Sequence, residues 1–242
     1  MRNAIYRNLP NIVSILGFLP IGLLLMEDGY RFLIPLIVFN NVMDDLDGIL
    51  AARLNLKSPV GAILDNVCDT VAHTLFVLVA GMHFGGVCAA ACVAATVGIM
   101  LRVADRLSNP SGGAKGSPTN ELIRHMFFLL LAAEILSFNP APFLVAVFLV
   151  HSVSMLVSFP MPHMIRSRAR SVFAICLVNL TLAVAWLAPS TTLVIAVAFV
   201  TTYLVSFSLG VYRYLRKSPE EERTEVEDSF PDRRARPVIY DQ

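Results

Sequence analysis

The stretch DDLDGILAAR (residues 44–53), followed by GAILDNVCDT (residues 61–70), places five aspartates inside a strongly apolar chain, and four of them form two pairs at helical spacing. Asp44 and Asp47 are three residues apart, and Asp65 and Asp69 are four residues apart. In a helix, each of these spacings brings two side chains to the same face. An ionisable group in a membrane segment costs about 2.5–3.5 kcal/mol on insertion scales, so it marks a functional candidate. The two stretches therefore predict a carboxylate site between neighbouring helices.

The composition around this site is that of a membrane protein. Of the 242 residues, 56% are hydrophobic and 15% are charged, and the mean hydropathy is +0.66. These values exclude an ordinary soluble domain and predict an all-α, polytopic membrane helical bundle with about eight transmembrane helices. Apolar segments of spanning length, separated by turn signals rich in Gly and Pro, cover residues 11–26, 32–53, 59–82, 86–107, 120–138, 140–158, 170–188 and 190–213.

The acidic residues are distributed unevenly. Eight of the 18 follow residue 219, and five of the other ten lie between residues 44 and 69. We predict a transmembrane catalytic domain over residues 1–217 and a disordered cytoplasmic tail over residues 218–242. Residues 1–9 fit a short interfacial segment, and the apolar stretch after them lacks a small-x-small cleavage site, so we expect it to be retained. No nucleic-acid partner is expected.

The basic residues predict an orientation. With both termini inside, 18 of the 19 Lys and Arg residues fall on the cytoplasmic side and Arg31 falls opposite. This asymmetry is what the positive-inside rule describes. The residues placed inside are Arg2, Arg7, Arg53, Lys57, Arg102, Arg106, Lys115, Arg124, Arg166, Arg168, Arg170 and the seven from Arg213 onward.

The residue types at the site indicate which ligands it suits. Carboxylate oxygens favour magnesium, manganese or calcium over zinc. Two such ions a few ångström apart could clamp a diphosphate during phosphoryl transfer. Gly48 and Gly61 remove side chains where a nucleotide could press against a helix.

Seven positions in this region resemble the signature of the CDP-alcohol phosphatidyltransferases. In that signature Asp, two residues, Asp-Gly, two residues and Ala-Arg are followed by eight residues, Gly, three residues, Asp, three residues and Asp. The matching residues are Asp44, Asp47, Gly48, Ala51, Gly61, Asp65 and Asp69. The family's arginine is replaced by Ala52, with Arg53 directly after it, so either Arg53 reaches the same ligand or that contact is lost.

The resemblance implies a role for each matching residue and a two-ion site for Mg²⁺ or Mn²⁺. The implied metal ligands are Asp44, Asp47, Asp65 and Asp69. Asp69 is also the implied general base, which would take the proton from the attacking hydroxyl. The implied nucleotide contacts are Asn11, Gly48, Ala51, Arg53 and Gly61.

Within the family, further segments resemble the bacterial and archaeal phosphatidylserine synthases. The matching residues are Pro10, Asn11, Ser14, Gly17, Arg102, Arg106, Gly116, Pro118, Thr119, Val157, Ser158 and Pro160. This likeness implies transfer of a phosphatidyl group from CDP-diacylglycerol to L-serine, giving phosphatidylserine and CMP. It also implies a homodimer in the prokaryotic inner membrane, with Arg102 and Arg106 binding the acceptor's carboxylate or a phosphate.

Several alternatives stay open at this stage. The acceptor could instead be glycerol 3-phosphate, inositol phosphate or choline, because Leu107 and Ser108 stand where an aromatic-Asn pair is usual. Arg102 and Arg106 could serve only as topology determinants. Intramembrane carboxylates also occur in cation or proton transporters, and a non-catalytic homologue is a third interpretation.

Overall fold

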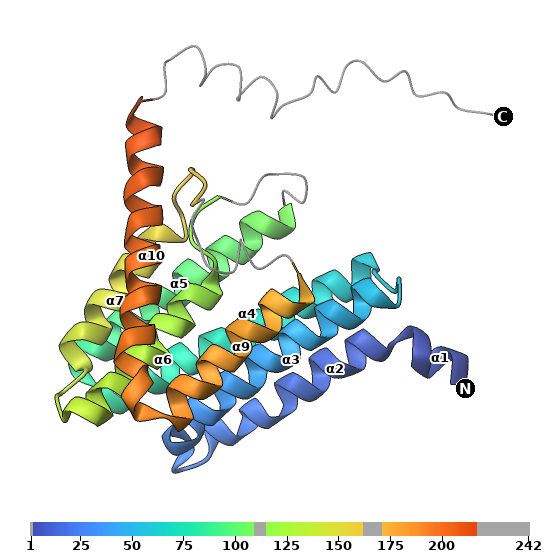
Figure 1. Ribbon diagram of the computed structural model, residues 1–242, viewed down its shortest axis with the longest axis horizontal. Coiled ribbons are helices and arrows are strands. Elements are labelled where there is room, and N and C mark those ends of the chain that lie inside the picture. The colour runs from blue at the N-terminus through green and yellow to red at the C-terminus, as the bar shows by residue number, and fades with distance from the viewer. Residues whose placement is uncertain (1, 109–114, 162–170, 217–242) are drawn as a thin grey trace.

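The computed structural model describes residues 2–108, 115–161 and 171–216, and within these ranges every regular element is a helix (Figure 1). The predicted all-α class is confirmed. The predicted tail, residues 218–242, and the basic residues 166–170 lie outside the described residues. The elements are α1 (Arg2–Arg7), α2 (Leu9–Phe18), η1 (Leu19–Leu25), η2 (Gly29–Phe32), α3 (Leu33–Arg53), α4 (Pro59–Phe84), α5 (Gly86–Ser108), α6 (Thr119–Leu136), α7 (Ala141–Ser154), α9 (Val172–Leu187) and α10 (Pro189–Arg216).

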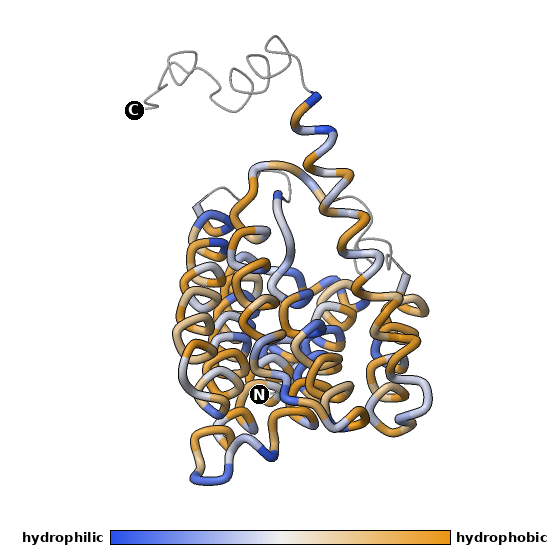
Figure 2. The backbone as a smooth tube through the Cα atoms, turned by 90° about the vertical axis from the view of Figure 1, so that its left-hand side faces the viewer, coloured by the Kyte–Doolittle hydropathy of each residue, from blue (hydrophilic) through white to orange (hydrophobic). Residues whose placement is uncertain are grey.

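The surface of the bundle is apolar, as expected for a protein surrounded by lipid. Among the described residues, α4, α5 and α10 are long and apolar enough to cross a membrane, and hydrophobic residues prevail along the helices (Figure 2). Large side chains such as Phe173 and Val194 are 78% and 74% exposed. So much exposed apolar area would be an aggregation hazard in water and is stable in a bilayer.

The first predicted span, residues 11–26, is not one continuous α-helix. It is α2 followed by the 3-10 helix η1, and the change comes at Leu19, just before Pro20. Proline has no amide hydrogen for the i→i−4 bond, so the chain tightens into i→i+3 bonding at this point.

The α3–α4 hairpin brings the two aspartate pairs together. After α3, Asn55 has φ 53° and the Leu56 amide donates to the Ala51 carbonyl at 2.9 Å. Ser58 then caps α4 by accepting from the Gly61 amide at 3.0 Å, and Pro59 is its first residue. This tight turn makes α3 and α4 antiparallel neighbours, so the end of α3 faces the start of α4.

Helices α2 and α9 also pack against α3. α2 packs against both α3 and α4, and α9 packs against α3 (Figure 1). Gly17 permits the approach of α2, because a Cβ there would lie 2.6 Å from the Met43 Cβ. The main hydrophobic core lies farther along α4, where Phe76, Phe127 and Phe148 are fully buried.

Candidate metal centre

One face of α3 carries polar side chains in a row. Asn40, Asp44 and Asp47 are four and three residues apart, and therefore lie on the same side of the helix. We call these three residues the site row. They line a pocket between α2, α3 and α4, together with Ser14, Gly17, Met43, Asp65, Cys68 and Asp69.

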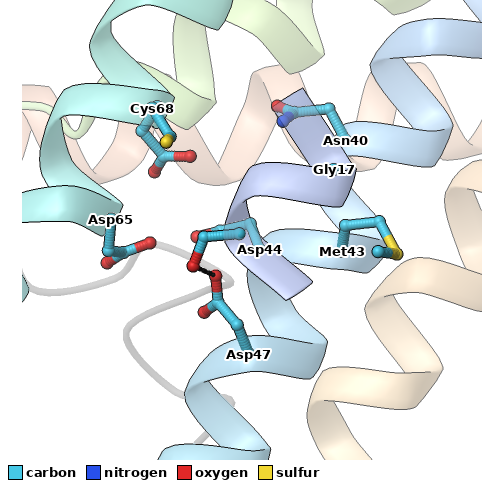
Figure 3. Close-up of a pocket in the computed structure, with 9 residues that line it drawn as sticks. Gly17, Asn40, Met43, Asp44, Asp47, Asp65 and Cys68 are labelled. Atoms are coloured by element: carbon cyan, nitrogen blue, oxygen red, sulfur yellow. Dashed lines mark hydrogen bonds between the residues drawn. The ribbon is translucent and has the colours of Figure 1, made fainter. Parts of the chain in front are cut away.

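Three carboxylates converge in this pocket. Asp44, Asp47 and Asp65 each have one oxygen within 4.8 Å of the others, and we call them the carboxylate triad. Figure 3 shows Asp65 on α4 and Asp44 and Asp47 on α3 directed toward the same space. Asp47 is buried and the other two are partly buried.

The triad fits a divalent cation. Two like charges about 4 Å apart repel by roughly 4 kcal/mol at an effective dielectric constant of 20. A hard cation bound between carboxylate oxygens removes this repulsion, and Mg²⁺ and Mn²⁺ prefer such ligands. The donor set of this site, all oxygen and from two helices, therefore suits the predicted metal.

Asp69 lines the same pocket but is not one of the three grouped carboxylates. It lies one helical turn beyond Asp65 on α4, on the same face of that helix. The predicted roles of Asp69 as a metal ligand and as the general base remain predictions.

Ser14 of α2 fixes one member of the triad. Its Oγ lies 2.5 Å from Asp47 Oδ2 and 3.2 Å from the Pro10 carbonyl oxygen. A hydroxyl has one proton, and the charged carboxylate is the nearer and stronger acceptor. Ser14 therefore donates to Asp47 and holds its orientation. In the sequence Ser14 stood out only as part of the likeness to phosphatidylserine synthases.

Two predicted glycines differ in their surroundings. A Cβ added at Gly48 would meet no atom of the described residues within 4 Å, so they leave space beside Asp47. A Cβ at Gly61 would lie 2.9 Å from Asn11 Oδ1 and 3.0 Å from Ser58 Oγ. Asn11 and Gly61, both predicted nucleotide contacts, are thus neighbours where α2 meets α4.

A sequence profile of the CDP-alcohol phosphatidyltransferases matches residues 7–157, more than half of the chain, and this range includes the whole pocket. The chain belongs to the CDP-alcohol phosphatidyltransferase family. Together with the apolar helices, this membership makes it an integral membrane protein.

Two relatives come from Aquifex aeolicus (strain VF5). One is named only as an uncharacterized protein and is 32% identical over 82 residues, which cover 33% of this chain and 42% of the relative. The other, named CDP-diacylglycerol–glycerol-3-phosphate 3-phosphatidyltransferase, is 35% identical over 80 residues, or 32% of this chain and 44% of the relative. The matches thus span less than half the length of either relative.

The other predicted family residues do not line the pocket. Ala51 lies one turn after Asp47, and Arg53 is the exposed last residue of α3. Arg102 Nη1 donates to the Lys115 carbonyl at 2.6 Å and to the Met155 carbonyl at 3.1 Å. Arg102 therefore links the segment before α6 to the end of α7, and Arg106 is exposed on α5.

Asn40 and Cys68 line the pocket and were not predicted as site residues. Asn40, which is 6% exposed, could have been found from its spacing, because it precedes Asp44 by four residues. Cys68 lies in an apolar run beside Asp69, and nothing in the sequence separates it from an ordinary packed thiol.

Proposed function

We propose that this protein transfers a phosphatidyl group from CDP-diacylglycerol to the hydroxyl group of a small polar alcohol and releases CMP. The observation that carries the proposal is the carboxylate triad, whose oxygens lie within 4.8 Å of one another in a chain of the CDP-alcohol phosphatidyltransferase family. Such a group of like charges favours a cation, and a cation favours a diphosphate.

Asp44, Asp47 and Asp65 would hold Mg²⁺ or Mn²⁺, with two ions expected and Asp69 as a further ligand. When bound, the ions would neutralise the diphosphate and the departing CMP. The protein itself holds the metal-binding carboxylates in position before the ions bind. The α3–α4 turn sets the distance between the helices, and Ser14 orients Asp47.

Asp69 would act on the acceptor. Its carboxylate would take the hydroxyl proton while the acceptor oxygen forms a bond to the phosphorus that carries diacylglycerol. The bond from that phosphorus to the bridging oxygen of CMP then breaks, and CMP leaves with the electron pair. The position of Asp69 on the wall of the same pocket supports this role.

The nucleotide would bind beside the triad. The space that the described residues leave beside Gly48, and the closeness of Asn11 to Gly61, support this position. Ala51 continues the site row, and Arg53 would replace the arginine that the family signature has at position 52. An unchanged KM for CDP-diacylglycerol in Arg53→Ala would reject the role of Arg53.

For the acceptor we propose L-serine, with glycerol 3-phosphate as the second candidate. Serine rests on the segments similar to phosphatidylserine synthases. Glycerol 3-phosphate rests on the name of the second Aquifex relative. Residues 9–25 contain no Lys or Arg, which counts against the glycerophosphate branch.

Arg102 and Arg106 would bind the acceptor's carboxylate or phosphate. Arg102 Nη1 already donates to two carbonyls, and the other nitrogens of its guanidinium would serve this role together with Arg106.

The surroundings of the reaction follow from the same reasoning. We propose an enzyme of the prokaryotic inner membrane with both termini cytoplasmic, so that the triad lies near the cytoplasmic side. We also propose that it is a homodimer, as the family resemblance implies. Cross-linking of the protein in native membranes and protease access to the C-terminal segment test these two points.

The deciding experiment uses the purified protein in nanodiscs with CDP-diacylglycerol, Mg²⁺ or Mn²⁺, and labelled L-serine. CMP release that depends on both the ion and serine is expected. Parallel reactions with glycerol 3-phosphate, inositol phosphate and choline identify the acceptor. If no acceptor supports CMP release while the protein carries a cation or proton flux in liposomes, the transferase proposal is wrong and a transporter is favoured.

A further inference from the structure

A second polar row runs along α3, away from the pocket. Asn41 and Asp45 are four residues apart and each follows a member of the site row, so they lie about 100° around the helix from it. We call them the anchor row. Asp45 is only 3% exposed and lies against α9.

The anchor row is tied to α6 and α9 by side-chain hydrogen bonds. Arg124 Nη2 on α6 donates to Asn41 Oδ1 at 3.2 Å. Asn41 Nδ2 donates to Asn179 Oδ1 on α9 at 2.6 Å. Asn179 Nδ2 donates in turn to Asp45 Oδ2 at 2.7 Å. We call these four residues the amide relay.

The relay has a direction. It begins at a cation, Arg124, and ends at an anion, Asp45, and each amide accepts from the cationic side and donates toward the anionic side. Turning either amide around would place donor against donor and acceptor against acceptor. Hydrogen bonds aligned in this way strengthen one another in a low dielectric, so the relay selects one arrangement of α3, α6 and α9.

The rotation of α3 decides whether the triad forms. A carboxylate lies roughly 5–6 Å from the axis of its helix, so a rotation of about 20° would move it roughly 2 Å. Metal ligands tolerate only about 0.2 Å. The hydrogen bonds of the anchor row add a directional restraint on this rotation to the one that apolar packing gives.

We propose that the amide relay is the positioning device of the metal centre: by fixing the rotation of α3, Arg124, Asn41, Asn179 and Asp45 hold Asp44 and Asp47 toward Asp65. This inference rests on the proposed function, because it assumes that the triad binds a divalent ion. The four residues are positioning residues and do not touch substrate.

The test exchanges the two ends of one hydrogen bond. Asn179→Asp puts a second carboxylate against Asp45 and breaks the relay. The double variant Asp45→Asn/Asn179→Asp restores it, because Asn at 45 can donate to Asp at 179, which still accepts from Asn41. Asn139→Asp is the matched control, since Asn139 is exposed and its Oδ1 accepts from the Ala141 amide at 3.0 Å, away from α3.

The readout is Mn²⁺ binding by the full chain in nanodiscs, measured by electron paramagnetic resonance of the free ion, with thermal unfolding in parallel. Loss of support behind metal ligands typically costs 10–100-fold in affinity, so Asn179→Asp should weaken Mn²⁺ binding by about that factor. The double variant should recover to within about threefold of the original protein, because coupled residues are strongly non-additive. Asn139→Asp should bind as the original does.

Each outcome decides. Mn²⁺ binding unchanged in a folded Asn179→Asp, or no recovery in the folded double variant, overturns the relay inference and leaves the proposed function standing. If Asn179→Asp does not fold, Asn179→Ser breaks the same bond without adding charge, and unchanged Mn²⁺ affinity in that variant overturns the inference. If the original protein binds no Mn²⁺ and releases no CMP, the proposed function fails, and the inference fails with it.

Discussion

Two regions of this bundle remove charged side chains from solvent in opposite ways. At the start of α6, Glu121 and Arg124 form an ion pair at 2.9 Å and are 2% and 1% exposed. At the α3–α4 hairpin, three carboxylates share a pocket, and none of the described residues that line it is basic. A buried pair of opposite charges satisfies itself and belongs to the structure. A partly buried group of like charges suits a cation, and this distinguishes a site from a scaffold.

The largest expected effect comes from removing a carboxylate of the triad. Asp65→Ala should lower CMP release to less than about a thousandth of the original rate, since the electrostatic stabilisation of the leaving group is lost. Raised Mg²⁺ should not restore the rate, because the ligand itself is missing. Glu134→Ala, at an exposed acid of α6, is the control. Near-normal turnover in Asp65→Ala would contradict the distinction between the carboxylate triad as a functional site and the Glu121–Arg124 pair as a structural one.

A smaller loss is expected when the proton acceptor is replaced. Asp69→Asn should reduce transfer by about 10²–10⁴-fold, the usual contribution of a general base. Mn²⁺ binding should persist in this variant, because Asp44, Asp47 and Asp65 remain. Parallel measurement of CMP release and Mn²⁺ binding separates the two roles. If metal affinity falls as steeply as the rate does, Asp69 is mainly a ligand.

The α6 pair should respond in stability. Arg124→Met leaves Glu121 buried without its partner. Breaking such a pair typically lowers the free energy of unfolding by about 3–5 kcal/mol, and we expect a loss of about this size here. The double variant Glu121→Gln/Arg124→Met should recover part of this loss. By contrast, Asp65→Ala in metal-free buffer should raise the melting temperature, because it relieves repulsion. Thermal unfolding in detergent measures both, and changes of the same sign would contradict our distinction.

The smallest effect is expected at the edge of the triad. Ser14→Ala removes the hydroxyl 2.5 Å from Asp47, and hydrogen bonds to charged groups contribute about 1.5–3 kcal/mol. Part of that loss will be taken up by reorientation of Asp47, so we expect Mn²⁺ affinity to fall by about three- to tenfold. Ser152→Ala, which removes a hydroxyl that donates a hydrogen bond to the Phe148 carbonyl, is the control. Unchanged Mn²⁺ affinity would show that the hydrogen bond from Ser14 on α2 is not required to orient Asp47.

The sequence predicted the helical bundle and the meeting of the aspartates because both depend on local spacing. Apolar segment lengths give the helices, and the i, i+3 and i, i+4 intervals give the faces. The turn at residues 57–59 was marked by its proline. The break of the first span was not predicted, since a single Pro20 in an apolar run is also compatible with a continuous, kinked helix.

Arg124 shows where sequence reasoning stops. It was counted among the basic residues flanking a cytoplasmic connection, but it is buried, paired with Glu121 and bonded to Asn41. Its partners are on α6 itself and on α3, and the next residue in the relay, Asn179, lies 138 positions after Asn41. No periodicity reports a contact at that separation, so the anchoring of α3 emerges only from the fold. The placement of Arg124 on the cytoplasmic side stays a prediction.

The space beside Gly48 has a practical consequence. Because a methyl group at this position meets none of the described residues within 4 Å, Gly48→Ala should leave the helical bundle intact and probe the ligand that binds beside α3. A series of progressively larger side chains at position 48 would measure the distance between α3 and the bound headgroup. The smallest side chain that raises the KM for CDP-diacylglycerol would report how near the substrate comes to α3.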